Sequence, residues 1–351
     1  MRADLALVGF GHVARRFVSL LDECRAALAR DHALECRLVG AATRQRGCLY
    51  RAQGLESAQL LSHWRGTPGA TSSALQIIEH LRESDADLRV VIETTTLDIR
   101  AGQPAIDHVR TGISAGCHVI TANKGPVAFA YAQLRDEALA AGVQFLFEGA
   151  VMDGVPVFNL VRETLPAATL SGFRGVVNST TNHVLTALER GEDFDAAVAR
   201  MQAEGIAEAD PSLDLDGWDA AAKTAALANV LLDARLTPHD VRRTGIQRSD
   251  GERARSVKAA GRRLKLVASA VRTGPAAVSA VVEPSEVAAS DLLASLDGKA
   301  NALVFQTDVL GEIAICQLDG SVTHTAYALL SDLVTLRRRQ GQRAAPARRI
   351  P

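Results

Sequence analysis

A short apolar strand that runs directly into a glycine turn and a helix is the feature that most restricts the fold. Residues 4–8 are Asp-Leu-Ala-Leu-Val, and Gly9-Phe-Gly-His-Val-Ala14 follows at once. This order is typical of a dinucleotide-binding βαβ unit. Its first glycine permits a tight turn, and its second lets a pyrophosphate approach the N-terminus of the helix. We therefore predict a cofactor site in this turn, with four contact residues: Gly9, Gly11, His12 and Val13.

The alternation of strands and helices predicts the rest of the architecture. Apolar strands are expected at residues 34–42, 88–93, 119–121 and 144–148. This pattern predicts an α/β domain over residues 1–148, with a doubly wound parallel sheet of the Rossmann type. Strands after residue 149 alternate less cleanly and predict a second, α+β domain with a mixed sheet, residues 149–320. We expect a helix at about 321–338 to pack back on the first domain, and residues 339–351 to form a disordered tail.

The end of the second strand bears on the choice of cofactor. Thr43-Arg-Gln-Arg46 contains no acidic residue that would bind a ribose 2′-hydroxyl, whereas its arginines suit a 2′-phosphate. We therefore predict NADP, with Arg44 as a contact. NAD stays open, because exposed arginines are common in proteins.

Two polar loops follow strands at the edge of the sheet where ligands bind in this fold. They are Thr94-Thr-Thr96 and Thr121-Ala-Asn-Lys-Gly-Pro126. We expect Thr94, Thr95 and Asn123 to offer their hydroxyl and amide groups to a ligand, and the ammonium of Lys124 to lie over the ligand crevice. The alternative for Lys124 is an ordinary surface lysine in a turn.

A dense run of carboxylates ends in one lysine. Six acids and one base lie between Glu204 and Lys223. In one interpretation Asp216 caps a helix and Asp219 forms an ordinary i,i+4 pair with Lys223. In the other, Asp219 holds a lysine that exchanges a proton with a substrate oxygen, and the remaining carboxylates bind a cationic group. The run alone leaves both open.

Composition excludes several classes of function. The net charge of −1 argues against a nucleic-acid or membrane-surface role. Five scattered cysteines without a Cys-x-x-Cys pair indicate a reducing cytoplasm and no zinc site. The first strand begins next to Met1, and no apolar run is long enough to span a bilayer, so we expect a cytoplasmic protein without a signal peptide.

Together these motifs resemble the homoserine dehydrogenase family, in the family's order, over about residues 5–335. The resemblance rests on the glycine turn, on residues 121–126 and 148–156, on Gly175-Val-Val-Asn-Ser-Thr-Thr-Asn182, and on the run from Glu208 to Asp-Gly-Trp-Asp-Ala-Ala-Ala-Lys223. It implies reversible oxidation of L-homoserine to L-aspartate 4-semialdehyde with NAD(P), in threonine and methionine biosynthesis. It also implies a homodimer formed through the substrate domains. Many members add a C-terminal regulatory domain of the ACT type; we expect a short form without it.

The resemblance assigns roles to individual residues. Lys223 matches the acid/base lysine and Asp219 its orienting carboxylate. A lysine in this role needs a pKa below about 10.4, which burial or a second ammonium would lower and Asp219 would raise. Lys124 matches a lysine between nicotinamide and substrate. The residues assigned to substrate are Glu208, facing the α-ammonium, with Asp214, Asn178 and Thr180.

A loop from residue 148 matches the family's monovalent-cation site, which usually holds sodium. The carbonyls of Val151, Asp153 and Val155 are the corresponding donors, with Glu148 alongside. Hard oxygen donors from a backbone loop suit a hard cation.

This chain departs from the family pattern at three places. Ser179 stands for the usual glycine, Ile206 for a tyrosine, and residues 316–320 for a glycine-rich loop. A paralogous dehydrogenase for a related amino alcohol or semialdehyde is the nearest alternative. A non-catalytic dinucleotide or metabolite sensor is a second, although such a protein would be expected to have lost the lysines or the carboxylates.

Overall fold

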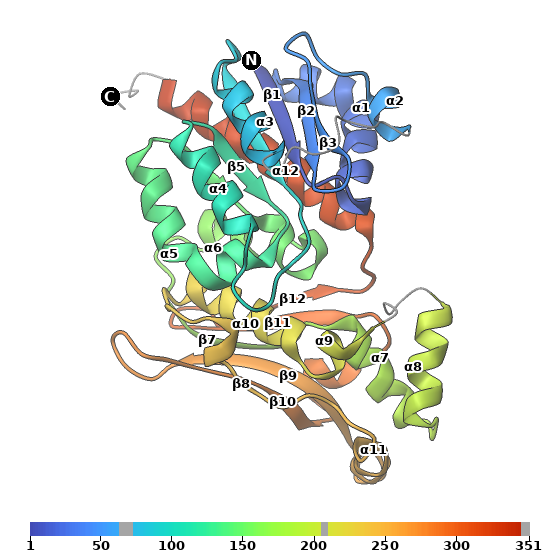
Figure 1. Cartoon of the computed structure of the whole chain (residues 1–351). Coiled ribbons are helices and arrows are strands. Elements are labelled where there is room, and N and C mark those ends of the chain that lie inside the picture. Colours follow the sequence, from blue (N-terminus) through green and yellow to red (C-terminus); the bar gives the residue numbers. More distant parts are fainter. Residues whose placement is uncertain (63–72, 205–209, 345–351) are drawn as a thin grey trace. The chain divides into compact units, whose positions relative to one another are not determined.

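The computed structural model describes residues 1–62, 73–204 and 210–344, and divides into two compact units. Unit 1 contains Met1–Pro126, Ala132–Pro156 and Ser321–Pro351, and unit 2 contains Val127–Tyr131 and Val157–Gly320. Figure 1 colours the chain along its sequence. None of the described helices combines the length and apolar character needed to cross a membrane.

Unit 1 is built on a sheet whose described strands run in the order β3-β2-β1-β4-β5-β6. Every pairing is parallel except that of β3 with β2. This confirms the predicted Rossmann-type sheet. The strands are β1 (Arg2–Val8), β2 (Glu35–Thr43), β3 (Gly47–Tyr50), β4 (Leu88–Glu93), β5 (His118–Thr121) and β6 (Phe145–Leu146). The helices are α1 (His12–His32), α2 (Ser57–Leu61), α3 (Ser73–Arg82), α4 (Ala105–Ser114), α5 (Lys124–Ala140), η1 (Glu148–Ala150), η2 (Met152–Gly154) and α12 (Val322–Ala344).

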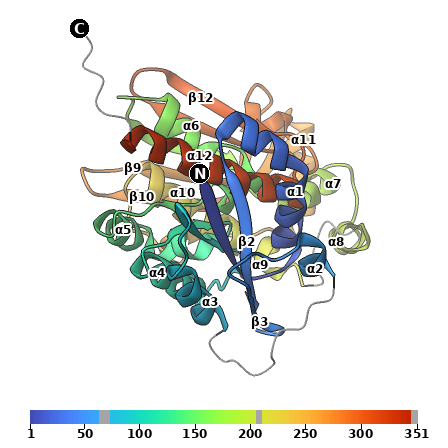
Figure 2. The same ribbon diagram turned by 90° about the horizontal axis from the view of Figure 1, so that it is seen from above.

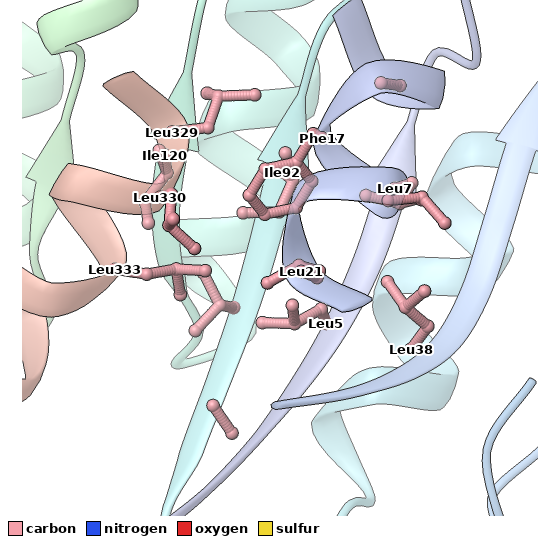
Figure 3. Close-up of a cluster of buried hydrophobic side chains, with 14 of the residues drawn as sticks. Leu5, Leu7, Phe17, Leu21, Leu38, Ile92, Ile120, Leu329, Leu330 and Leu333 are labelled. Atoms are coloured by element: carbon pink, nitrogen blue, oxygen red, sulfur yellow. The ribbon is translucent and has the colours of Figure 1, made fainter. Parts of the chain in front are cut away.

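Successive residues of a strand point to opposite faces of the sheet, and helices cover both faces. On one face, Leu5, Ile92 and Ile120 pack with Phe17 of α1 and Leu333 of α12 (Figure 3). The other face carries α3 and α4, and both helices lie very close to the strands. A Cβ on Gly40 of β2 would lie 2.6 Å from Ile77 of α3, and a Cβ on Gly112 of α4 would lie 2.9 Å from Val119 of β5. Figure 2 shows α1 and α12 on one side of β1 and β2, and α3 and α4 on the other.

Helix α12 extends further than the sequence suggested. Its buried residues recur at helical spacing, namely Ala326, Leu329, Leu330, Leu333 and Leu336. The helix continues to Ala344, so the expectation of a disordered tail is wrong for residues 339–344. Each buried leucine side chain stabilises the packing of this helix by about 1.5–3 kcal/mol. All of these leucines precede residue 339. Residues 345–351 lie outside the described part.

Unit 2 contains a second sheet, whose described strands run in the order β12-β11-β7-β9-β10-β8. Neighbours are antiparallel except β8 and β10, which confirms the predicted mixed sheet. The strands are β7 (Leu170–Val176), β8 (Arg242–Arg243), β9 (Arg262–Arg272), β10 (Val278–Ala288), β11 (Asn301–Thr307) and β12 (Gly311–Gln317). The helices are α6 (Val157–Thr164), α7 (Ser179–Leu188), α8 (Phe194–Ala203), α9 (Ser212–Leu215), α10 (Trp218–Leu231), η3 (Pro238–Asp240), α11 (Asp250–Ala259) and η4 (Leu292–Ser295).

A short part of α5, residues 127–131, belongs to unit 2. The helix is kinked there, since Ala130 has φ −140° and ψ 15°. A kink interrupts the helical ladder and exposes carbonyls that need other donors. The buried amide of Asn229 supplies them: its Nδ2 lies 3.2 Å from the Val127 carbonyl oxygen and 3.3 Å from that of Ala128.

Candidate active site

The glycine turn leaves open space at the N-terminus of α1. Gly9 has φ +91°, and its N–H donates to the Ala42 carbonyl at 2.9 Å. Gly11 is the N-cap of α1, and a Cβ added there would meet nothing within 4 Å. The first N–H groups of a helix, here those of His12 and Val13, have no acceptor within the helix and carry partial positive charge. The turn therefore has the shape and polarity that a pyrophosphate requires.

The two polar loops of unit 1 use their side chains on each other. Thr94 Oγ1 donates to the Gly9 carbonyl at 3.2 Å, and Thr95 Oγ1 donates to the Glu93 carboxylate. Asn123 Nδ2 donates to the Thr95 carbonyl at 2.9 Å. In this structure these donors therefore have partners within the protein, and their contact with a ligand stays a prediction. Buried polar groups need partners, and in these loops protein atoms supply them. Lys124 is the first residue of α5.

The arginines after β2 lie in the turn of a β2–β3 hairpin that the sequence analysis missed. Arg44 is exposed, and the backbone N–H of Arg46 donates to Thr43 Oγ1 at 2.8 Å. Within the described residues, Arg46 Nη1 is buried without a hydrogen-bond partner. A buried guanidinium nitrogen without an acceptor is unfavourable, so the turn suits an anionic group.

The predicted cation loop is a tight and unusual backbone segment. Met152, Asp153 and Gly154 have φ values of +52°, +49° and +87°. A Cβ on Gly154 would lie 2.7 Å from that of Ala328, so the loop presses against α12. Among the described residues, no group of three or more His, Cys, Asp or Glu side chains is arranged to hold a metal. The predicted site uses carbonyl oxygens, to which that observation does not apply.

Glu148, at the start of this loop, is buried beside a second buried acid. Its backbone N–H donates to Asp332 Oδ2 at 2.9 Å, and the two residues are 2% and 1% exposed. The sequence analysis missed Asp332. The sequence feature that could have identified Asp332 is its place as a single acid within the apolar face of α12.

In unit 2, the pair predicted from the i,i+4 spacing is present at one end of α10. Lys223 Nζ lies 2.7 Å from Asp219 Oδ2 and also donates to the Val177 carbonyl at 2.7 Å. The two side chains are 15% and 17% exposed. The lysine is thus held by two acceptors, and its side chain is largely buried.

Asn178 joins this pair to Asp214. As N-cap of α7, its Oδ1 accepts the Thr181 N–H at 2.8 Å, which directs its Nδ2 towards the carboxylates. Nδ2 donates to Asp214 Oδ1 at 2.7 Å and to Asp219 Oδ2 at 2.9 Å. Burial raises the pKa of Asp214, the charge of Asp219 raises it further, and hydrogen bonds from Asn178 and Thr180 oppose the shift. Four of the predicted residues of this unit (Asn178, Asp214, Asp219 and Lys223) therefore form one hydrogen-bonded cluster, and Thr180 contacts it through Asp214.

Other predictions about the acidic run need correction or lie outside the structure. Asp216 does not cap α10, because Gly217, with φ +81°, is the N-cap and makes the turn from α9. Asp210 Oδ1 accepts the Ser212 N–H at 3.1 Å in the turn that begins α9. Glu208 and Ile206 lie outside the described residues. The unusual Ser179 donates to the Lys299 carbonyl at 3.1 Å, so its hydroxyl ties α7 to the segment before β11.

Helix α7 is anchored beneath the cluster by a buried amide and a buried lysine. Asn182 Nδ2 lies 3.1 Å from the Gly298 and Ala300 carbonyl oxygens. Lys265 of β9 is 0% exposed, and its Nζ donates to Asn182 Oδ1 at 2.9 Å and to the Leu296 carbonyl. Burial, with a smaller contribution from the charge of Arg263, lowers the pKa of Lys265 from the ordinary 10.5 to about 8.

We expect Lys265 to make stability rise with pH in the alkaline range. Between about pH 8 and 10.5 the unfolded chain holds this proton and the folded chain releases it, so the free energy of unfolding increases across that window. The contribution is on the order of 3 kcal/mol. Urea unfolding of wild type and of Lys265→Met at several pH values measures this contribution. From pH 8 upwards, the free energy of unfolding of wild type should rise relative to that of Lys265→Met. A difference independent of pH would contradict the buried, titrating lysine.

Comparisons with known proteins found matches to both parts of the chain. Residues 9–148 match the family model for the NAD binding domain of homoserine dehydrogenase, and residues 156–334 match the model for homoserine dehydrogenase. The chain is 38% identical over 339 residues to the NAD(+)-dependent homoserine dehydrogenase of Pseudomonas canavaninivorans, covering 94% of this chain and 95% of that protein. It is 33% identical over 340 residues to the homoserine dehydrogenase of Methanocaldococcus jannaschii, covering 94% and 97%. The crystal structure of a homoserine dehydrogenase from Thiobacillus denitrificans matches with a TM-score of 0.83 and 29% identity, covering 100% of this chain and 76% of that one.

Proposed function

Because this chain belongs to the homoserine dehydrogenase family, we infer that it interconverts L-homoserine and L-aspartate 4-semialdehyde with a nicotinamide dinucleotide. It is an NAD(P)-dependent oxidoreductase of amino-acid biosynthesis. The observation that carries the reaction at residue level is the cluster of Lys223, Asp219, Asp214 and Asn178, since it fixes an ammonium beside carboxylates.

We propose the following roles for the cluster. The bound dinucleotide supplies the hydride acceptor. Lys223 removes the proton from the substrate hydroxyl and, in the reverse direction, returns it to the carbonyl oxygen. Asp219 and the Val177 carbonyl hold the lysine in place. Asp214 binds the substrate, and Glu208 faces the α-ammonium group of the substrate.

The domain roles follow from the same proposal. Unit 1 binds the dinucleotide through the glycine turn and the loops at residues 94–95 and 123–124, with Lys124 acting at the nicotinamide end. Unit 2 binds the substrate, and Asn178 and Thr180 contribute to that site.

A spectrophotometric assay with homoserine and either NAD or NADP at alkaline pH tests the activity. Formation of reduced dinucleotide that depends on homoserine is the expected result. Turnover of a different amino alcohol, with none of homoserine, would reject the substrate and keep the reaction class. Dinucleotide binding without turnover of any alcohol would reject the enzyme.

We propose NADP as the preferred cofactor, supported by the acid-free turn that carries Arg44 and by the unpartnered nitrogen of Arg46. Arg44→Ala should lower kcat/KM for NADP by about 10-fold or more, since a charge-assisted bond contributes about 1.5–3 kcal/mol, and should spare kcat/KM for NAD. Arg51→Ala is the matched control, because Arg51 is an exposed arginine at the other end of the hairpin. An unchanged NADP-to-NAD ratio in Arg44→Ala would reject the preference. NAD is the cofactor named for the Pseudomonas relative.

We also propose a sodium ion at the carbonyls of Val151, Asp153 and Val155, beside Glu148. The left-handed backbone of residues 152–154, braced against α12, supports a preformed loop. Comparing turnover in sodium and in tetramethylammonium salts tests the site, and equal rates would reject it.

A homodimer formed through unit 2 is a further proposal. Large apolar side chains of this unit are exposed, including Val309, Leu310 and Leu318 at 71%, 53% and 81%. Sedimentation equilibrium tests it, and a monomer at working concentrations would reject it.

We expect a cytoplasmic location, supported by the five free cysteines. Cell fractionation tests this location, and recovery outside the cytoplasm would reject it.

A further inference from the structure

The last residue of β4 is a completely buried acid that none of the roles above uses. Glu93 is 0% exposed. Its Oε1 accepts the Thr95 N–H at 2.9 Å and the Thr95 hydroxyl, and its Oε2 accepts the Thr121 hydroxyl at 2.7 Å. His108 of α4 lies nearby, with Nδ1 3.9 Å from Oε1. Glu93 therefore joins the loop after β4 to the end of β5.

Hydrogen bonds extend from Glu93 to both sides of Lys124. Thr121 Oγ1 accepts the Asn123 N–H at 2.9 Å, and Asn123 Nδ2 donates back to the Thr95 carbonyl at 2.9 Å. Asn123 Oδ1 accepts the Gly125 N–H at 2.8 Å. The path from Glu93 through Thr121 and Asn123 returns to Thr95 and forms a closed ring. Lys124 lies between the two residues, Asn123 and Gly125, whose backbones this ring fixes.

The same network reaches the glycine turn. A Cβ on Gly9 would lie 2.7 Å from the Thr94 carbonyl carbon, and Thr94 N–H donates to the Val8 carbonyl at 2.8 Å. The backbone at residues 94–95 is therefore in direct contact with the turn that receives the pyrophosphate. A shift of that backbone would displace both parts of the cofactor site.

Packing alone does not call for an acid at this position. In the sheet register, Val8 of β1 pairs with Glu93, which pairs with Thr121 of β5, and Val8 fills its place with an apolar side chain. Burying a carboxylate costs several kcal/mol unless hydrogen bonds compensate. Here three donors from the ligand-binding loops supply the compensation, so the acid and the conformation of these loops depend on each other.

We propose that Glu93 is a positioning residue for the dehydrogenase reaction, which sets the backbone of the cofactor loops and of Lys124 through Thr95, Thr121 and Asn123. The inference rests on the proposed function of those loops. Glu93 itself touches neither substrate nor cofactor in this proposal. It acts by holding in place the groups that do.

The variants Thr121→Val and Thr121→Ser test the network without removing the acid. Valine keeps the shape of threonine and loses the hydroxyl, whereas serine loses a methyl group and keeps the hydroxyl. We expect kcat/KM for the dinucleotide to fall on the order of 100-fold in Thr121→Val, as for a displacement of about 1 Å. Thr121→Ser should stay close to wild type. The reverse order, with Thr121→Ser the more impaired, would overturn the proposal, because it would indicate packing.

Glu93→Gln tests the acid directly, and Asp4→Asn is its matched control. Glutamine presents an amide to the threonine donors and should lower kcat/KM for the dinucleotide as Thr121→Val does. Asp4 is also 0% exposed in the same sheet, but it pairs with Arg37 through bonds of 2.8 and 2.7 Å, near the start of β1. Asp4→Asn should lower the melting temperature and leave kcat and KM of the folded enzyme unchanged. Equal kinetic losses in Glu93→Gln and Asp4→Asn would overturn the proposal.

Lys124→Ala, measured in parallel, separates this inference from the function on which it rests. Loss of turnover in Lys124→Ala with normal kinetics in Glu93→Gln would overturn the role of Glu93 alone. Full turnover in Lys124→Ala would reject the assigned role of Lys124 and this inference with it. The expected result is a kinetic loss in both Lys124→Ala and Glu93→Gln, with Thr121→Ser close to wild type.

Discussion

Lys223→Ala is expected to lower the turnover of homoserine by a factor of ~100 or more and to leave binding of the reduced dinucleotide nearly unchanged. The ammonium is held 2.7 Å from Asp219 Oδ2 and 2.7 Å from the Val177 carbonyl oxygen, and it is the group to which we assign the proton exchange. Steady-state kinetics with homoserine, combined with a fluorescence titration of the dinucleotide, measure both quantities. Undiminished turnover would remove Lys223 from the role.

Two further variants identify the property that Lys223 contributes. Lys223→Arg keeps the positive charge, but a guanidinium does not release a proton in this pH range, so turnover should remain low. Recovery of turnover in Lys223→Arg would indicate that charge alone is needed. Lys258→Ala is the matched control: Lys258 Nζ donates to the Glu189 carbonyl in the same unit and belongs to no proposed site. Its kinetics should equal those of wild type.

The local parts of the fold could be predicted because their signals lie within a few residues. Strand β4 (Leu88–Glu93) begins and ends where the apolar pattern indicated. The i,i+4 pair of Asp219 and Lys223 follows in the same way from helix geometry alone.

Contacts between distant segments could not be predicted in this way. Asn178 reaches Asp214 and Asp219 across 36 and 41 residues, and no periodicity in the sequence encodes that approach. The error at Asp216 has a local cause. Aspartate is a favoured N-cap, but the turn between α9 and α10 needs a left-handed residue, and Gly217 takes that place.

The polar side chains at the cofactor loops show a further limit of sequence interpretation. Thr94, Thr95 and Asn123 were expected to offer their side chains to a ligand, because polar loop residues at this edge of a sheet often do. In the structure, their hydrogen bonds join the loops to each other, to Glu93 and to the glycine turn. A sequence indicates which residues lie near such a site, whereas the structure is needed to find where their donors point.

Gly9→Ala is expected to destabilise the protein and to abolish dinucleotide binding together. Gly9 has φ +91°, a conformation that costs an L side chain about 1–3 kcal/mol. Its new Cβ would also lie 2.7 Å from the backbone of Thr94, which must then move. Urea unfolding and a dinucleotide titration measure the two effects. Gly142→Ala is the control, because Gly142 has φ +70° and a Cβ there would meet nothing within 4 Å, so only stability should fall.

Gly11→Ala should separate binding from stability, because the two glycines of the turn are constrained for different reasons. Gly11 has an ordinary φ of −85°, and its Cβ would meet no protein atom within 4 Å, so the fold has no need of glycine there. The added methyl group would instead occupy the space through which a pyrophosphate approaches the N–H groups of α1. We expect the free energy of unfolding to stay the same or to rise by about 0.4–1 kcal/mol, and dinucleotide affinity to fall by about 10- to 100-fold. Unchanged affinity in Gly11→Ala would place the pyrophosphate elsewhere. A matching loss of stability would mean that Gly11, like Gly9, is required by the fold.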